Sequence, residues 1–467
     1  MSDDRSLETP TLMVATFTSF MGPFMISAVN VALPAIQKEF SVSAVLLSWI
    51  ATSYLLATAV FLVPFGKLAD IHGRKKTFAL GLMVFVLSSL LTAFSISVWM
   101  LIILRVFQGM GTAMIVTTGM AIVTSVFPPN KRGSAIGIYV AAVYIGLSLG
   151  PFVGGALTHH FGWRSIFIAI VPFGLVSIYI TLTYLKKEWV GERGGKFDTI
   201  GSILYGFALL TLICGASLLP NKAAYFIMAV GMVGFIAFAK QEQRVNSPVF
   251  DLKLFRNNKL FAFSSLAALI NYAATFAITF LLSLYLQFIK GMNPRSAGLI
   301  LIAQPIVMAV LSPLAGRWSD RIEPRIIASG GMAVTVLGLV QLITIGETTS
   351  LAYLIAILSM LGFGFALFSS PNMNAIMSSV EKRHYGIASG AVATMRLLGQ
   401  MFSMATATVV FAIVLGKLQI TPSTYDLFLK SFKTILFIFA FICTVGIFFS
   451  FSRGALRETS SISSKKV

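Results

Sequence analysis

The chain has 467 residues and a formal net charge of +19; 57% of its residues are hydrophobic and only 11% are charged. A soluble globular protein carries about 25% charged residues, so this composition excludes a soluble protein and places the apolar residues against lipid. The positive charge could indicate nucleic-acid binding. However, the Lys and Arg residues lie in short segments between apolar runs, a pattern that membrane topology explains better.

Fourteen apolar runs are long enough to cross a bilayer as helices, which takes about 20 residues each. They lie near residues 11–36, 46–66, 77–97, 100–126, 134–158, 165–185, 199–219, 223–240, 260–288, 296–316, 326–345, 351–379, 387–416 and 432–452. We therefore predict an all-α integral membrane protein with fourteen spans. The even number of spans puts both termini on the same side of the membrane.

The basic residues indicate the orientation of these spans. If the N-terminus is inside, the inner segments carry 25 of the 35 Lys and Arg residues and the outer segments carry 8. Lys and Arg accumulate in cytoplasmic loops. We therefore expect a multi-pass protein of the plasma membrane with both termini in the cytoplasm. The two remaining basic residues, Arg105 and Arg396, lie inside spans.

The sequence repeats itself at an offset of about 250 residues. The segment from Gly66 to Asp70 matches the segment from Gly316 to Asp320, and similar matches follow in later spans. Two homologous six-helix halves would explain the repeat, which is a common plan among transporters. We expect an N-terminal six-helix bundle (1–198), two extra helices with a cytoplasmic loop (199–259), and a C-terminal six-helix bundle with a tail (260–467).

The short segment between spans 2 and 3 has a distinctive pattern of glycines and charges. Gly66 and Gly73 can supply a tight turn, and Asp70 can accept hydrogen bonds from a neighbouring helix N-terminus. Arg74 and Lys75 add positive charge. We expect these five residues to form a cytoplasmic gating loop, although a basic loop that only sets the topology is the simpler alternative.

Span 5 carries a repeated small-residue pattern. Gly146, Gly150 and Gly154 are four residues apart, so they share one face of a helix and let a neighbouring backbone approach closely. Pro151 removes one hydrogen bond of the helix, and Gly155 follows. Packing alone would explain the glycines, and this is compatible with a role in transport.

Span 4 contains a charged residue at membrane depth. Arg105, Gln108 and Thr112 share one helical face. A charge inside a span costs at least about 2.5 kcal/mol and usually faces a cavity, although Arg105 could instead reach outward to the membrane surface. Other polar residues inside spans are further candidates for a substrate cavity, each more often a helix–helix hydrogen bond. They are Asn30, Tyr54, Tyr144, Asn271, Gln304, Asn372, Arg396 and Gln400.

Together these motifs resemble those of the major facilitator superfamily. The segment from Gly66 to Lys76 matches its loop signature, the glycines and proline of span 5 match its antiporter motif, and Arg105 to Gly111 matches its Arg-x-x-Gln-Gly-x-Gly element. Fourteen spans resemble the drug:proton antiporter branch. The resemblance implies two six-helix bundles around a central pocket plus two extra central helices. It also implies a transporter that works by alternating access and, from the antiporter motif, an exporter.

One position departs from that branch. Span 1 of the branch carries an Asp where this chain has Met25. A buried carboxylate can carry a proton, whereas methionine cannot. His159 and His160, at the outer end of span 5, could substitute because histidine titrates near neutrality. The coupling ion is therefore left open.

We expect a secondary transporter that exports lipophilic small molecules as a proton antiporter. The alternative is a transporter of an anionic metabolite or lipid, which uses Arg105 and Arg396 and is not coupled to protons. The expected partners are a small-molecule substrate, the lipid bilayer and protons, and we expect a monomer that binds no nucleic acid, cofactor or metal. No catalytic constellation is present at membrane depth, so an enzyme is not expected.

Overall fold

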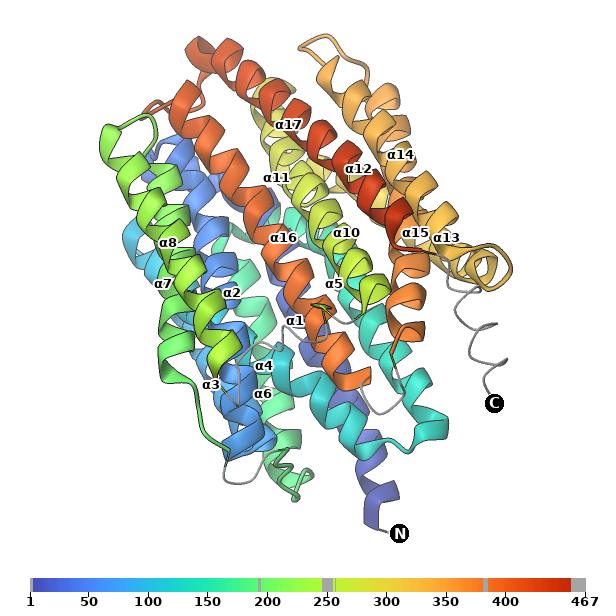
Figure 1. Ribbon diagram of the computed structural model, residues 1–467. Coiled ribbons are helices and arrows are strands. Elements are labelled where there is room, and N and C mark those ends of the chain that lie inside the picture. Colours follow the sequence, from blue (N-terminus) through green and yellow to red (C-terminus); the bar gives the residue numbers. More distant parts are fainter. Residues whose placement is uncertain (1–2, 192–194, 246–254, 257, 381–384, 455–467) are drawn as a thin grey trace. The chain divides into compact units, whose positions relative to one another are not determined.

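The computed structural model describes residues 3–191, 195–245, 255–256, 258–380 and 385–454. Within these ranges the chain forms helices and no strand (Figure 1). Fourteen helical segments of the described residues are long and apolar enough to cross a membrane. The prediction of an all-α protein with fourteen spans is confirmed.

The first eight spans are single helices. They are α1 (Asp3–Phe40), α2 (Ala44–His72), α3 (Arg74–Ala93), α4 (Val98–Val126), α5 (Pro129–Phe161), α6 (Arg164–Thr183), α7 (Thr199–Ser217) and α8 (Lys222–Arg244). Short polar side chains begin several of them, because such side chains accept hydrogen bonds from the free N–H groups of the first turn. Ser43, Ser97, Asp198 and Asn221 do this for α2, α4, α7 and α8.

Two of the later spans are interrupted. The later elements are α10 (Lys259–Thr275), α11 (Ala277–Leu284), the π-helix η1 (Tyr285–Ile289), α12 (Pro294–Leu301), α13 (Ala303–Arg321), α14 (Pro324–Ile343), α15 (Leu351–Ser378), α16 (Tyr385–Val414), the 3-10 helix η3 (Pro422–Thr424) and α17 (Tyr425–Ser452). One span breaks at Phe276 and then becomes π-helical, and the next span breaks at Ile302. Single π-helical turns inside helices are frequent at functional sites.

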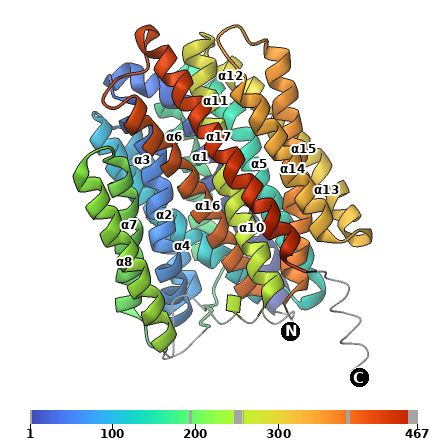
Figure 2. The ribbon, with the colours of Figure 1, turned by 45° about the horizontal axis from the view of Figure 1, so that its top comes forward.

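The chain divides into two compact units. Unit 1 contains residues 1–250, 283–298 and 404–424, and unit 2 contains residues 251–282, 299–403 and 425–467. In unit 1, α7 and α8 pack along each other, and α7 packs on α2 (Figures 1 and 2). The Tyr205 hydroxyl donates to the Ala59 carbonyl at 3.1 Å and ties α7 to α2. The three sequence domains that we expected describe the repeat in the chain and remain a prediction.

The repeat is visible in how helices cross. In unit 1, a Cβ on Gly111 of α4 would lie 2.8 Å from the carbonyl oxygen of Gly81 in α3. In unit 2, a Cβ on Gly364 of α15 would lie 2.8 Å from the carbonyl oxygen of Gly331 in α14. Only glycine permits backbones to approach this closely. Each unit therefore contains the same tight crossing at matching positions of the repeat.

Candidate functional site

Arg105 lies inside unit 1 with a side chain that is only 1% exposed. Its Nε donates to the Ile50 carbonyl at 3.2 Å, and its Nη1 donates to Gln108 Oε1 at 2.6 Å. The Gln108 amide in turn donates to Ser89 Oγ at 2.6 Å. These bonds join α2, α3 and α4. The alternative in which Arg105 reaches outward is wrong, because its partners hold the guanidinium within the helices.

Tyr54 closes this cluster from α2. The Arg105 guanidinium carbon lies 4.1 Å from the centre of the Tyr54 ring, a cation–π distance. The Tyr54 hydroxyl lies 2.8 Å from Thr112 Oγ1. The structure therefore brings together Tyr54, Arg105, Gln108 and Thr112, as the shared face of span 4 indicated. Nε and Nη1 of Arg105 thus donate within this cluster and link α2 to α4.

Met25 and Asn30 lie on the buried part of α1. Met25 is 0% exposed, so the side chain that replaces the usual span 1 carboxylate packs in the core of unit 1. Asn30 is also buried, and its Oδ1 has no hydrogen-bond partner in the described part of the chain. Tyr144 of α5 is half-buried. His159 and His160 are exposed at the end of α5, with ring centres 4.8 Å apart.

The expected gating loop is shorter than the sequence suggested. Helix α2 continues to His72, so Gly66 is helical and does not form the turn; Gly73, with a φ of 122°, forms it. Our span ended where the apolar run ended, whereas the backbone hydrogen bonds of the helix continue beyond the apolar residues. Asp70 and Arg74 flank the turn, and Arg74 Nε donates to Asp70 Oδ1 at 2.8 Å. The half-buried Lys75 follows in the first turn of α3.

The anion at the start of α3 is Glu188 rather than Asp70. Glu188 Oε1 accepts from the Lys75 N–H at 2.8 Å, and its Oε2 accepts from the Lys76 N–H at 3.2 Å. A carboxylate is favoured at a helix N-terminus. Arg74 also donates to Ser125 Oγ at 3.0 Å, which links the turn to the end of α4. Sequence reasoning missed Glu188, because it lies more than 110 residues from the helix that it caps.

The glycines of α5 fit two different neighbours within unit 1. A Cβ on Gly146, Gly150 or Gly154 would lie within 3 Å of atoms of α1, so the predicted face of small residues is confirmed. Pro151 and Gly155 lie on a second face. A Cβ on Gly155 would overlap the Pro294 carbonyl oxygen, and a Cβ on Gly298 would overlap the Pro151 carbonyl oxygen. The antiporter pattern thus permits close packing on both sides, against backbone and small side chains of α1 and against the backbone of residues 294–298.

Further hydrogen bonds in unit 1 join α1 and α2 to chain segments from the second half. Gln287 Nε2 donates to the Val31 carbonyl at 2.8 Å, and Gln37 Nε2 donates to the Ile420 carbonyl at 3.1 Å. The Ala44 N–H donates to the Leu418 carbonyl at 3.1 Å. Residues 283–298 and 404–424 therefore accept hydrogen bonds from the N-terminal helices or donate them to these helices, and both side chains and backbone take part.

Within the described part of the chain, the candidate residues of unit 2 make no hydrogen bonds to one another. Asn271 is 0% exposed, and neither atom of its amide has a hydrogen-bond partner among the described residues. Gln400 is buried, and Gln304 is half-buried next to the break at Ile302. Arg396 is half-buried, and within the described ranges it has no hydrogen bond or ion pair. The repeat residue Asp320 has a side chain outside the described set.

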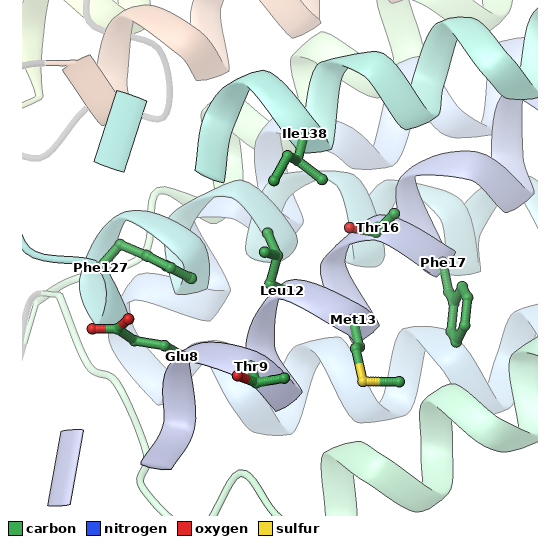
Figure 3. A pocket seen from close by; sticks show the side chains of 8 residues that line it. All are labelled: Glu8, Thr9, Leu12, Met13, Thr16, Phe17, Phe127 and Ile138. Atoms are coloured by element: carbon green, nitrogen blue, oxygen red, sulfur yellow. The ribbon is translucent and has the colours of Figure 1, made fainter. Parts of the chain in front are cut away.

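A pocket of about 370 Å³ opens beside the first half of α1, a size that falls within the range of ligand pockets. Figure 3 shows the side chains around it. They are Glu8, Thr9, Leu12, Met13, Thr16 and Phe17 of α1, Phe127 after α4, and Ile138 of α5. Most of this lining is apolar, with one carboxylate near the start of the helix. No group of three or more His, Cys, Asp or Glu residues that could hold a metal ion occurs in the described part of the chain.

The model of the Major Facilitator Superfamily matches residues 12–404. The chain belongs to this family. It is therefore a multi-pass membrane transporter and not an enzyme, and it uses the fold that the motifs indicated. The match includes residues of both copies of the repeat and ends within α16, before the last span.

Relatives of this transporter include exporters. The riboflavin transporter RibZ of Clostridioides difficile is 31% identical over 85% of this chain and 86% of its own length. The multidrug resistance protein Stp of Mycobacterium tuberculosis is 32% identical over 86% of this chain and 76% of its own length. The tetracenomycin C resistance and export protein of Streptomyces glaucescens is 28% identical over 87% of this chain and 76% of its own.

Solved structures of the family share the fold. A bacterial homologue of the lysosomal transporter Spinster, in an inward-facing and unoccupied conformation, has a TM-score of 0.66 with 15% identity over 97% of both chains. The peptide transporter POT, in complex with alafosfalin, has a TM-score of 0.68 with 14% identity over 95% of this chain and 97% of its own. At these identities the likeness concerns the fold alone.

Proposed function

We propose that this transporter exports lipophilic small molecules by alternating access, as a proton antiporter. The observation that carries the proposal is the two-sided glycine packing of α5. Pro151 and Gly155 meet residues 294–298 backbone to backbone, and the pattern to which they belong resembles the motif that is associated with exporters. A multidrug resistance protein and an antibiotic export protein among the relatives support the same direction of transport.

The pocket beside α1 supports a lipophilic substrate. Leu12, Met13, Phe17, Phe127 and Ile138 supply an apolar wall. Methionine and aromatic side chains adapt to ligands of different shape, which suits a transporter with varied substrates. The hydroxyl groups and the single carboxylate of this lining would orient a polar end of the bound molecule.

Proton coupling requires a carrier other than residue 25. Met25 is buried in the core and cannot titrate. We propose that His159 and His160 are the first positions to test, since both are exposed at the end of α5. The distribution of Lys and Arg further supports a plasma-membrane location with both termini in the cytoplasm, and we propose that the transporter acts as a monomer.

Efflux from cells tests the direction and the substrate class. Lipophilic dyes of positive, neutral and negative charge are loaded into cells that produce the wild type, the Gly155→Leu variant or the matched Gly137→Ala variant. Gly137 is in the same helix, and a Cβ there would meet nothing within 4 Å. We expect faster dye loss with the wild type and Gly137→Ala than with Gly155→Leu. If all three retain the dyes as strongly as cells without the transporter, export of lipophilic molecules is contradicted.

An anionic metabolite or lipid is the second candidate substrate, and Arg396 favours it. Its guanidinium is half-buried and has no partner among the described residues, so it could receive a negatively charged group. Arg105 fits this role less well, because its Nε and Nη1 already donate to protein acceptors. If the substrate is an anion, Arg396→Gln should abolish its uptake while Arg396→Lys retains part of it.

A further inference from the structure

Arg453 directly follows α17, and its guanidinium is buried in unit 2, with 2% of the residue exposed. Its Nη1 donates to Asn372 Oδ1 at 2.7 Å and to Ser264 Oγ at 3.3 Å. The Asn372 amide donates to the Ser264 carbonyl at 3.0 Å, so the cluster links α10, α15 and α17. Nε and Nη2 of Arg453 are buried without an acceptor among the described residues. A buried cation with unmatched donors is unfavourable unless an anion compensates it.

A second arginine lies at the same level. Arg325 is the second residue of α14, its Nε is also buried without an acceptor in the described part of the chain, and its guanidinium lies 5.7 Å from the Phe451 ring. Ser329 of α14 lies 2.9 Å from Ser450 of α17 through their hydroxyl oxygens. The start of α14 therefore packs beside the end of α17. At 1.5 Å per residue, Arg325 and Arg453 lie about one turn beyond this serine pair in the same direction.

Within the described part of the chain, the charge around Arg325 and Arg453 is positive. Burial is the main reason why the pKa of the Arg453 guanidinium falls to about 10; the nearby Glu323 carboxylate opposes this shift, and the positive charge of Arg325 adds to it. Arg453 therefore stays protonated at neutral pH. The positive end of the α14 dipole adds to the two guanidinium groups. Among the described residues, the carboxylate that acts on Arg453 is that of Glu323, and its one negative charge is smaller than the two positive charges of the arginines.

The repeat shows which group occupies the matching place in unit 1. Helix α3 corresponds to α14 at the offset of about 250 residues, and its first N–H groups are bound by the carboxylate of Glu188. Glu323 precedes α14 but makes no side-chain hydrogen bond to the helix start. The start of α3 in unit 1 therefore binds the carboxylate of Glu188, whereas two arginines lie near the start of α14 in unit 2.

We propose that the start of α14, together with Arg325 and Arg453, binds a phosphate group carried by an anionic lipid headgroup. In this site the half-buried Arg325 makes the outer contact, and the unpaired Nε and Nη2 donors of the buried Arg453 make the inner contact. Guanidinium groups match phosphate oxygens in pairs. The last span ends at Ser452, so the site lies at the membrane boundary, where basic pockets between helices take anionic headgroups. This proposal does not depend on the transported substrate.

Thermal unfolding in nanodiscs tests the site. The full-length protein is placed in phosphatidylcholine alone, in phosphatidylcholine with phosphatidylglycerol, and in phosphatidylcholine with added inorganic phosphate. We expect phosphatidylglycerol to raise the unfolding temperature of the wild type by about 3 °C or more. Arg453→Gln and Arg325→Gln should lose most of this gain, whereas Arg317→Gln, an exposed arginine of α13, should keep it.

The dependence of the unfolding temperature on the lipid distinguishes lipid binding at this site from a purely structural role of Arg453. Arg453→Gln should unfold in phosphatidylcholine no earlier than the wild type, because it removes an unbalanced buried charge. An equal loss of stability in every lipid, an unchanged gain in both Gln variants, or no gain in the wild type with either lipid or phosphate would overturn the proposal. A gain with inorganic phosphate alone would support the phosphate chemistry and assign it to a soluble ligand.

A third variant covers the case in which Arg453→Gln does not fold. Arg453→Lys keeps the charge but loses the paired donors of the guanidinium. Its apparent affinity for phosphatidylglycerol, from titration of the lipid, should fall about tenfold. An affinity equal to that of the wild type would contradict the part that we assign to Arg453.

Discussion

Gly298 lies so close to Pro151 that any Cβ at residue 298 would overlap the Pro151 carbonyl oxygen. At this position the two backbones meet directly, between α5 and a segment of the second half of the chain that belongs to unit 1. We propose that this contact forms and separates during the transport cycle, so that a side chain larger than glycine at residue 298 opposes the state in which it is formed.

The first prediction concerns this contact. Gly298→Leu should weaken the state in which residues 294–298 pack on α5, because overpacking costs about 1–3 kcal/mol. A cost of that size changes the population of the state by roughly tenfold to a hundredfold. Transport should fall by a similar factor while the protein still purifies as a folded membrane protein. Gly137→Ala is the matched control, and a Gly298→Leu variant that transports normally would show that the contact is not part of the cycle.

The second prediction concerns Arg105. Arg105→Lys keeps the charge but cannot donate to both the Ile50 carbonyl and Gln108 Oε1 while its head also lies over the Tyr54 ring. Leaving buried acceptors unpaired costs about 1–3 kcal/mol. The unfolding temperature of the Arg105→Lys variant in detergent should be lower than that of the wild type, with or without each substrate tested. If stability is unchanged and only anion transport is lost, Arg105 is a substrate ligand, and a stabilising role for its link between α2 and α4 is wrong.

A third prediction separates Glu188 from Asp70. Glu188→Ala removes the cap of α3 and should cost about 1 kcal/mol of stability, whereas Glu188→Gln keeps one acceptor and should cost less. Asp70→Asn should leave the fold intact and impair transport, because it removes the charge that Arg74 meets across the turn. Thermal unfolding and transport are measured on all three variants. Normal transport by Asp70→Asn would exclude a gating role for this turn.

The fourth prediction tests whether the missing carboxylate can be restored. Met25→Asp places a carboxyl group at a position that is 0% exposed, which should destabilise the protein by about 3 kcal/mol or more if the group stays charged. Met25→Leu keeps the volume and should cost less than about 1.5 kcal/mol. Expression and unfolding temperature distinguish the two. A stable Met25→Asp variant with stronger proton coupling would show that α1 faces a hydrated cavity at this position.

Features that repeat within one helix could be predicted from the sequence. The spacing of Gly146, Gly150 and Gly154 fixes one face of α5, and the spacing of Arg105, Gln108 and Thr112 fixes one face of α4, because both follow from 3.6 residues per turn. The apolar runs indicated the number of spans, because a helix needs about 20 apolar residues to cross the bilayer. These predictions need no knowledge of which helices are neighbours.

Features that depend on contacts between distant segments could not be predicted. Glu188 reaches the start of α3 from more than 110 residues away, and Arg453, which we placed in the cytoplasmic tail, is buried against α10 and α15. The end of α2 was misplaced for a different reason. The apolar run ends where the hydrocarbon core of the membrane ends, whereas the helix continues through polar residues as far as His72.

Proton exchange in proteoliposomes tests the central claim most directly. The purified protein is reconstituted with a pH-sensitive dye trapped inside, a proton gradient is imposed, and lipophilic cations and organic anions are added one at a time. We predict that at least one lipophilic compound dissipates the gradient with the wild type and Gly137→Ala, and about tenfold more slowly or not at all with Gly298→Leu. Uptake of a labelled organic anion, with no compound dissipating the gradient, would contradict the proposed antiport and leave Arg396 as the residue on which transport depends.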